Sequence, residues 1–172
     1  MLVLLVRHGH AGSKRSWRGD DRLRPLDPVG LTQADALTAL LVPYAPERIV
    51  SSPLLRCIQT VAPLAETLGF RIERSKQLVP DATAAAESLV RRVGKKEAGP
   101  IVLCTHGEVI RDFQLRLHKT QPDLFGRAPL REKGSVWVLE RVGQKFVSAR
   151  YLAPPAETDM AAGADTTDTD PT

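Results

Sequence analysis

The chain opens with MLVLLVRHGH (residues 1–10), in which an apolar run from Leu2 to Val6 ends at Arg7 and His8. A short apolar run of this kind is typical of a buried strand. The charged pair that follows has two interpretations. It marks the point at which a strand leaves the core, or it belongs to a functional site at the end of that strand. The rest of the sequence decides between the two.

After this run, short apolar segments alternate with segments whose apolar residues recur at helical spacing. The alternation predicts an α/β fold, a three-layer α/β/α sandwich with a mostly parallel central sheet and a C-terminal β-hairpin. Pro43 ends the first helical pattern, and Gly69 is a natural stop for the second. The expected strands are 2–6, 48–51, 70–73, 100–104, 135–141 and 145–151, and the expected helices are 30–42, 53–69, 82–93 and 108–117.

Length and charge define a basic domain followed by an acidic tail. The 172 residues fit one domain, which we place at residues 1–152. Residues 153–172 contain five acidic residues, no Lys or Arg and few groups to bury, so we expect a disordered tail. The first 152 residues then carry 24 basic against 15 acidic side chains. Such a surplus suggests an anionic partner, although a solvated basic face explains it equally well.

Other classes of protein are disfavoured by what the sequence contains. The opening apolar run is too short for a membrane helix and lacks a preceding basic segment, so we expect a cytoplasmic protein without membrane contact. Cys57 and Cys104 match neither a disulfide framework nor a zinc motif, and we expect no metal and no cofactor. With few aromatic residues and no recognised nucleic-acid motif, nucleic acid ranks below phosphorylated partners. A monomer is favoured.

Three expected strands end in residues suited to phosphate chemistry. Arg7 and His8 follow the first, Arg56 lies just beyond the second, and His106 follows the third. Ligands of parallel sheets bind at the carboxyl ends of strands, where these side chains converge. The guanidinium group of Arg recognises phosphate with a planar fork of donors, and a neutral His can attack phosphorus. Each residue alone is a weak signal, but their joint occurrence at strand ends favours a phosphoryl-transfer site.

Four motifs carry a resemblance to a known family. The sequence resembles the histidine phosphatase, or phosphoglycerate mutase-like, superfamily over about residues 1–150. Within it, the compact body looks like the small SixA-type phosphohistidine phosphatases. The matching motifs are LVRHGHA (5–11), RPLDPVGLTQA (24–34), SSPLLRCIQT (51–60) and VLCTHGEVI (102–110). Two further stretches, GSKRSWRGDDRLRPLD (12–27) and KGSVWVLE (133–140), are closest to the phosphatase domain that is appended to the Nudix domain in mycobacterial MutT-type hydrolases.

The resemblance implies a role for each of the four Arg and His residues at the strand ends. His8 is the expected nucleophile, forming a phosphohistidine intermediate, and the neighbouring glycine backbone is the expected acceptor for its other ring N–H. Arg7 and Arg56 are expected to bind the phosphoryl oxygens, and His106 to stabilise the transition state. Two guanidiniums and a second imidazole supply the charge without a metal.

The general acid is less clearly marked. Many family members place an acidic residue after the third strand, where this sequence has Asp81, and we predict Asp81 for this role. Glu87 and Glu108 are the alternatives, although a carboxylate near a helix start is commonly a cap. SixA-type members manage without a clear acid, because a good leaving group needs little help.

Several further residues are expected to bind substrate. Residues 12–24 form a basic loop directly after the nucleophile strand, so the loop should overhang the pocket. Within it, Trp17 either stacks on a base or packs on the loop itself, and Arg24 either binds phosphate or pairs with a nearby Asp. The expected substrate-binding residues are Gly9, Ser13, Lys14, Arg18, Arg24 and Gly107.

These observations favour a metal-independent phosphatase. Its substrate is either a phosphohistidine on a protein or a phosphate on a nucleotide or small molecule. Two alternatives stay open, a non-catalytic phosphate-binding module and, less favoured, a phosphoglycerate mutase. The mutase ranks lower because the sequence shows no insertion that would close over a bisphosphate.

Overall fold

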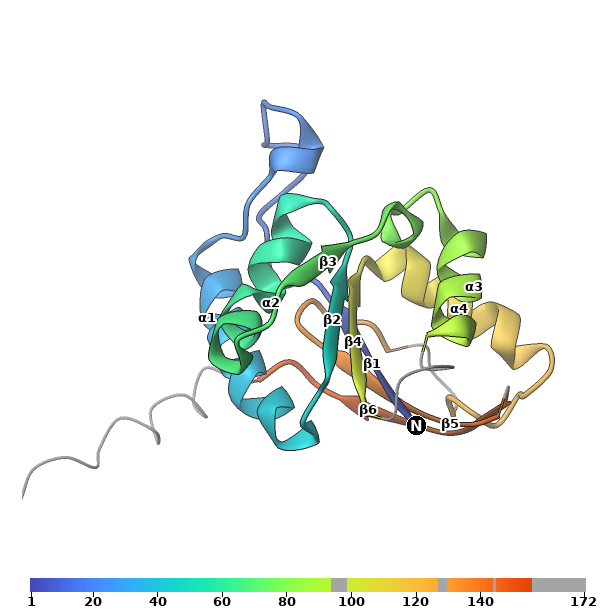
Figure 1. Ribbon diagram of the computed structural model, residues 1–172. Helices are drawn as coiled ribbons and strands as arrows, with labels where there is room; N and C mark the ends of the chain where they lie inside the picture. The colour runs from blue at the N-terminus through green and yellow to red at the C-terminus, as the bar shows by residue number, and fades with distance from the viewer. Residues whose placement is uncertain (94–98, 127–129, 144, 156–172) are drawn as a thin grey trace, which may run out of the picture.

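The computed structural model describes residues 1–93, 99–126, 130–143 and 145–155, and it has three layers (Figure 1). A six-stranded sheet with the order β3-β2-β4-β1-β5-β6 lies between two pairs of helices. The strands are β1 (Leu2–Arg7), β2 (Arg48–Ser51), β3 (Ile72–Arg74), β4 (Ile101–Thr105), β5 (Val136–Val142) and β6 (Lys145–Leu152). The helices are α1 (Pro28–Leu41), α2 (Leu55–Leu68), α3 (Thr83–Arg92) and α4 (Gly107–His118), with short 3-10 turns η1 (Asp21–Leu23), η2 (Val42–Tyr44) and η3 (Lys76–Leu78).

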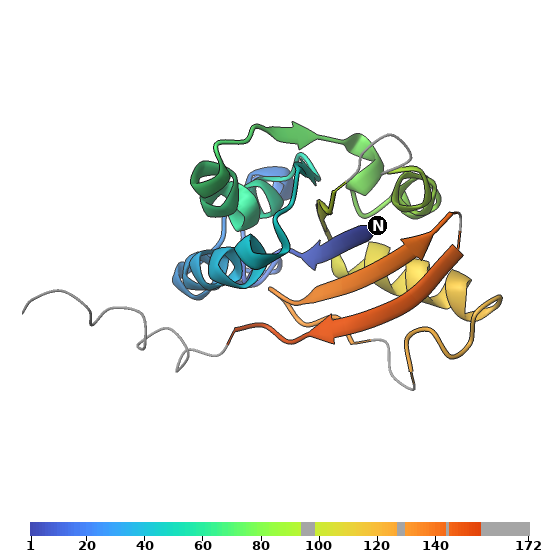
Figure 2. The ribbon, with the colours of Figure 1, turned by 60° about the horizontal axis from the view of Figure 1, so that its bottom comes forward.

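The sheet is parallel over its first four strands and antiparallel at the C-terminal hairpin. Strands β1 and β4, β2 and β4, and β2 and β3 pair in parallel, whereas β5 runs antiparallel to β1 and β6 to β5. Figure 2 shows β5 and β6 as a long curved pair beside the parallel strands. The predicted α/β/α sandwich with its C-terminal hairpin is therefore confirmed.

The opening apolar run is explained by the two layers of helices. Alternate residues of β1 point to opposite faces, so Val3 and Leu5 pack with α3 and α4, and Leu4 and Val6 pack with α1 and α2. All four side chains are fully or almost fully buried. A strand covered on both faces needs apolar residues at every position, not at every second one.

Two element boundaries differ from the sequence prediction for local reasons. Helix α1 begins at Pro28, two residues early, because the Asp27 carboxylate accepts a hydrogen bond from the Gly30 N–H and caps the helix. Strand β3 begins late, because the Phe70 N–H donates to the Ala65 carbonyl and completes the end of α2.

Part of the expected tail lies outside the described residues. Residues 153–155 continue from β6, and residues 156–172 belong to the undescribed part of the chain. No helix among the described residues is long and apolar enough to cross a membrane.

Candidate active site

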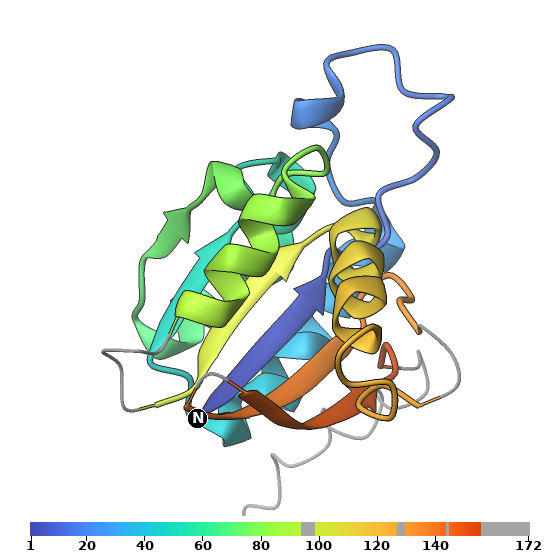
Figure 3. The same ribbon diagram turned by 90° about the vertical axis from the view of Figure 1, so that its right-hand side faces the viewer.

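The register of the parallel strands brings the three predicted strand ends together. Arg7 of β1 pairs with Thr105 of β4, and the His8 N–H donates to the Thr105 carbonyl at 3.0 Å. His8 and His106 each follow directly on this last pair of residues, so they lie at the same edge of the sheet. The ends of β1 and β4 point the same way in Figure 3, toward the loop between β1 and α1 that projects beyond the sheet.

His8 is the side chain best placed to attack phosphorus. It is buried, and its Nδ1 lies 2.8 Å from the Gly9 carbonyl oxygen. Since that oxygen only accepts hydrogen bonds, Nδ1 carries the proton, and the Gly9 carbonyl is the glycine acceptor that the resemblance implied. Desolvation by burial, aided by the charges of Arg56 and Arg7, lowers the pKa of His8 to about 3. The ring is therefore neutral near neutral pH, and its Nε2 keeps the lone pair that a nucleophile needs.

His106 lies against His8 and is also held in one orientation. The two rings meet edge to face, with their centroids 5.2 Å apart. His106 Nε2 lies 2.9 Å from Ser52 Oγ, and its Nδ1 lies 3.5 Å from Nη2 of Arg56. A guanidinium only donates, so Nδ1 accepts and Nε2 holds the proton. Desolvation by burial, then the charges of His8 and Arg56, lowers the pKa of His106 to about 2.

Two arginines supply buried donors beside the histidines. Arg56 in the first turn of α2 is 3% exposed, and Arg7 ends β1. The Nε of each is buried and has no hydrogen-bond partner among the described groups. Buried N–H groups are paired in nearly all folded proteins, so these two donors fit a site built for an oxyanion.

Gly107 explains how Arg7 fits beside the start of α4. A Cβ atom at Gly107 would lie 2.8 Å from Cζ of Arg7, closer than real side chains approach. Gly107 therefore leaves room for the Arg7 guanidinium, which any larger residue at this position would displace. Gly9 donates its N–H to Thr60 Oγ1 at 2.9 Å, which joins the nucleophile loop to α2.

Two helices begin at the edge of this site without a side-chain cap. Helix α2 starts after Leu54 and α4 after His106, and neither residue caps its helix with a side-chain hydrogen bond. The first N–H groups of a helix carry partial positive charge and favour anions nearby. The helix starts thus add to the charge of the arginines.

Together these groups line a cavity of about 270 Å³ with a marked positive balance. Five lining residues are cationic side chains and two are carboxylates. The lining consists of Arg7, His8, Gly12, Lys14, Asp21, Arg24, Arg56, Pro80, His106, Glu108 and Lys133. Of the residues predicted from sequence, the structure brings His8, Arg7, Arg56, His106, Lys14 and Arg24 together here.

The loop between β1 and α1 reaches the cavity through η1. The Asp21 carboxylate accepts from Arg24 Nε at 2.8 Å and lies 3.3 Å from Nη2 of Arg56, and the Asp21 carbonyl accepts from Nη1 of Arg56 at 2.8 Å. Asp21 therefore fastens the loop to Arg56. Trp17 packs within the loop, since its indole N–H donates to the Asp20 carbonyl at 3.0 Å.

Five residues expected at the site do not line the cavity, and Gly9 and Gly107 are two of them, each adjacent in the chain to a lining histidine. Ser13 and Arg18 are exposed residues of the loop between β1 and α1 that lie outside the lining. Asp81 is also exposed, since the turn before α3 presents Pro80 to the cavity and Asp81 to the outside. The carboxylates that do line it are Asp21 and Glu108.

Sequence reasoning missed four lining residues, Gly12, Asp21, Pro80 and Lys133, of which Asp21 and Lys133 are charged. Asp21 was treated only as a local partner for Arg24, and the pairing with Arg56 spans 35 positions of the chain. Lys133 begins the stretch KGSVWVLE (133–140), which resembles the MutT-associated phosphatase domain, but no local sequence pattern marks the lysine as a site residue. His10 lies outside the lining, because its Nδ1 pairs with the Asp27 carboxylate.

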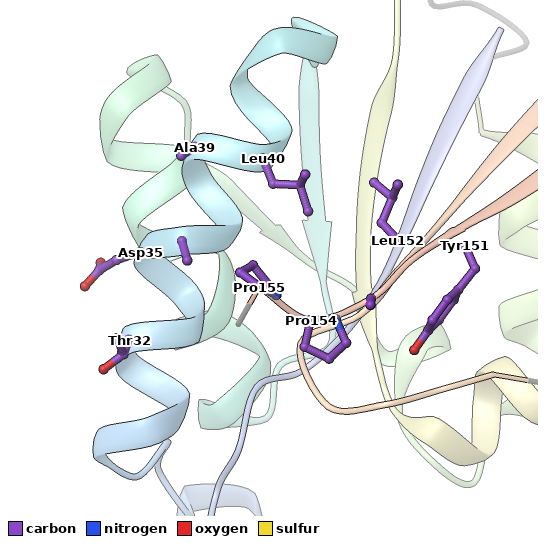
Figure 4. Close-up of a pocket in the computed structure, with 10 residues that line it drawn as sticks. Thr32, Asp35, Ala39, Leu40, Tyr151, Leu152, Pro154 and Pro155 are labelled. Carbon is purple, nitrogen blue, oxygen red and sulfur yellow. The ribbon is translucent and has the colours of Figure 1, made fainter. Parts of the chain in front are cut away.

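A larger cavity elsewhere lacks this chemistry. It measures about 880 Å³ and lies between α1 and the end of β6 (Figure 4). Thr32, Asp35 and Tyr151 are its polar residues, and the others are aliphatic or proline. None of the residues predicted for phosphate chemistry lines it.

Comparisons with known proteins agree with the motifs and the fold. The model of the histidine phosphatase superfamily (branch 1) matches residues 3–80. The 8-oxo-(d)GTP phosphatase of Mycolicibacterium smegmatis (strain ATCC 700084 / mc(2)155) is 36% identical over 162 residues, which cover 90% of this chain and 49% of the relative. The chain thus spans about half the length of this curated relative.

Solved structures share the fold at low sequence identity. The protein histidine phosphatase SixA in complex with tungstate matches with a TM-score of 0.69 and 18% identity, covering 90% of this chain and 97% of that one. The mycobacterial glucosyl-3-phosphoglycerate phosphatase Rv2419c in complex with VO3 matches with a TM-score of 0.64 and 21% identity, covering 88% and 96%. The family-model match places residues 3–80 in the histidine phosphatase superfamily, the curated relative is similar over 90% of this chain, and the solved structures show a shared fold.

Proposed function

We propose that this protein is a phosphatase that transfers a phosphoryl group first to Nε2 of His8 and then to water. One observation carries the proposal. A neutral His8, with its proton held on Nδ1 by Gly9, lies beside buried arginine donors in a cationic cavity. A module that only binds phosphate has no need for a nucleophile held in a single tautomer.

The geometry suggests a role for each group in the two steps. Arg7 and Arg56 hold the equatorial oxygens of the transferred phosphoryl group, which spreads the charge of the transition state. His106 lies against His8 and accepts from Nη2 of Arg56 through its Nδ1, so it supports the guanidinium that holds these oxygens. Attack by Nε2 of His8 forms the nitrogen–phosphorus bond as the bond to the leaving oxygen breaks. Water then attacks the phosphohistidine, releasing phosphate and restoring the neutral ring.

Two substrate classes follow from the relatives. The name of the mycobacterial relative points to a nucleotide-type phosphate, and the likeness to SixA points to a phosphohistidine on a protein. The first class is supported at higher sequence identity, 36% against 18%. The cavity of about 270 Å³ accepts the phosphoryl end of either substrate.

The test of the function is turnover by the wild-type protein without metal. In the presence of EDTA, we expect release of phosphate from p-nitrophenyl phosphate, a nucleotide or a phosphohistidine peptide, measured with a colorimetric phosphate assay. A binding module would instead take up orthovanadate, detected by calorimetry, and release no phosphate from any of the three. That second result would overturn the enzymatic proposal and leave the binding alternative.

A second experiment assigns the general acid. We expect Glu108→Gln to lower kcat for alkyl phosphates by about tenfold to a hundredfold, because a poor leaving group needs a proton. The same variant should leave p-nitrophenyl phosphate almost unaffected, since nitrophenolate departs unaided. Asp81→Asn is the matched control, as its carboxyl lies outside the cavity lining. Selective slowing of alkyl phosphates by Asp81→Asn instead would return the role to Asp81.

A further inference from the structure

Two lysines line the cavity in addition to its arginines. Lys14 comes from the loop between β1 and α1, and Lys133 precedes β5. Among the residues that the structure describes, neither ammonium group forms a salt bridge. Asp21 pairs with Arg24 and Arg56, and the charge of Lys14 contributes less than theirs to its lowered pKa.

The cations lie at different depths. His8 and Arg56 are 6% and 3% exposed and form the floor of the cavity, whereas Lys133 is half-buried and Lys14 exposed. A phosphoryl group in contact with His8 occupies the floor. The lysines are then left to meet the part of the substrate that lies nearer the mouth.

Lys133 is held in place relative to the nucleophile. The N–H of Gly134 lies 3.2 Å from the Arg7 carbonyl and 3.1 Å from the His8 carbonyl, and Gln33 Nε2 donates to the Lys133 carbonyl at 3.2 Å. Gly134 has a φ of +81°, a conformation that other residues rarely adopt. The backbone of Lys133 is thus tied to the residues that carry the chemistry.

The electrostatics around Lys133 favour an anion beside it. Burial, and then the positive charges of Arg7 and Arg24, lower the pKa of Lys133. These like charges repel one another in the free protein, and an anionic group between them would turn repulsion into attraction.

Asp21 is unsuited to protonating a leaving group. Burial alone would raise its pKa, but the hydrogen bond from Arg24 and the charge of Arg56 outweigh this and lower it. Asp21 is therefore a carboxylate near neutral pH. Apart from Glu108, the proposed acid for poor leaving groups, the charged lining residues beside Asp21 are all cations, an arrangement that suits a leaving group departing as an anion.

We propose that Lys14 and Lys133 form a second anion subsite and that the substrate is a diphosphate ester. Resting on the proposed function, this inference gives each phosphate a place. The terminal phosphoryl group lies on the floor against His8, and the adjoining phosphate lies between the two lysines.

The reaction then balances without a proton donor. Nε2 of His8 forms a bond to the terminal phosphorus as the bridging phosphorus–oxygen bond breaks, and the electron pair stays on the bridging oxygen. The leaving group is a monophosphate ester, whose charge the lysines stabilise. Water hydrolyses the phosphohistidine to inorganic phosphate and returns His8 to its neutral form.

The kinetic test compares substrates that differ in the second phosphate. Lys133→Met should lower kcat/KM for ADP and for methyl diphosphate by on the order of tenfold, and Lys14→Met with Lys133→Met by more. Both variants should lower kcat/KM for p-nitrophenyl phosphate, which has a single phosphate, by clearly less than they lower it for ADP and methyl diphosphate. Lys145→Met, an exposed lysine on β6, is the matched control and should change neither. Equal losses on all three substrates would overturn the subsite.

A binding test separates this inference from the proposed function. We expect the wild-type protein to bind imidodiphosphate more tightly than phosphate in calorimetry, and the double lysine variant to lose that preference. Equal affinities in the wild type, or an unchanged preference in the variant, would overturn the subsite whether or not the protein turns over substrate. Turnover of p-nitrophenyl phosphate with none of ADP or methyl diphosphate would also overturn it, while leaving the phosphatase proposal intact.

Discussion

His8→Ala should abolish turnover, with kcat/KM for p-nitrophenyl phosphate falling by at least about a thousandfold. Alanine removes the proposed nucleophile, and we expect the remaining arginines to bind phosphate without transferring it. The direct measurement is the phosphoenzyme. Wild-type protein that is mixed with a labelled phosphate donor and then denatured should carry an acid-labile, base-stable adduct, and the variant should carry none.

The matched control for this experiment is the neighbouring histidine. His10 lies two positions further on, but its ring pairs with Asp27 and lies outside the cavity lining. His10→Ala should therefore retain the labelled adduct. An adduct that persists in His8→Ala and disappears in His10→Ala would assign the nucleophile to His10 and contradict the proposed mechanism.

Arg56→Lys is expected to have the second largest effect, lowering kcat/KM by about a hundredfold. Lysine keeps the charge but presents a point donor in place of the planar fork that matches phosphoryl oxygens. It also loses the contacts with the Asp21 carbonyl and carboxylate, so the loop is less firmly held. The affinity for orthovanadate, measured by inhibition, should fall together with kcat/KM.

Stability must be measured alongside activity for this variant. Asp21 keeps Arg24 as a partner and is partly exposed, so the free energy of unfolding should fall by only about 1–2 kcal/mol. Arg111→Lys is the control, because Arg111 pairs with its neighbour Asp112 on the exposed face of α4. Wild-type vanadate affinity in a folded Arg56→Lys protein would exclude Arg56 from phosphoryl binding.

The fold could be predicted from the sequence because its main signals are local. The run Leu2–Val6 and the apolar segment before Thr105 are apolar at every position, which indicates strands that are covered on both faces. Parallel strands share the edge at which they end, so Arg7, His8 and His106 could be expected to meet. The errors fell at element ends, where single hydrogen bonds from Asp27 and Phe70 set the boundary.

The details of the site could not be predicted in the same way. Asp81 matches the family pattern in sequence, but the turn before α3 presents Pro80 to the cavity instead. Asp21 pairs with Arg56, and Lys133 is fixed beside Arg7 through its neighbour in the chain. These contacts join distant parts of the chain, and no short-range pattern encodes them.

The sequence by itself determined the class of fold and indicated phosphoryl-transfer chemistry, because the first depends on local periodicity and the second on residue types at strand ends. Only the tertiary structure decided which nitrogen of His8 is free, which loop side chains face the substrate, and where the unpaired lysines lie. The physical reason is that a tautomer, a buried charge and a cavity wall are set by groups that folding brings together. The contacts of Asp21 with Arg56 are the clearest example, because they join a loop to a helix 35 positions further along the chain.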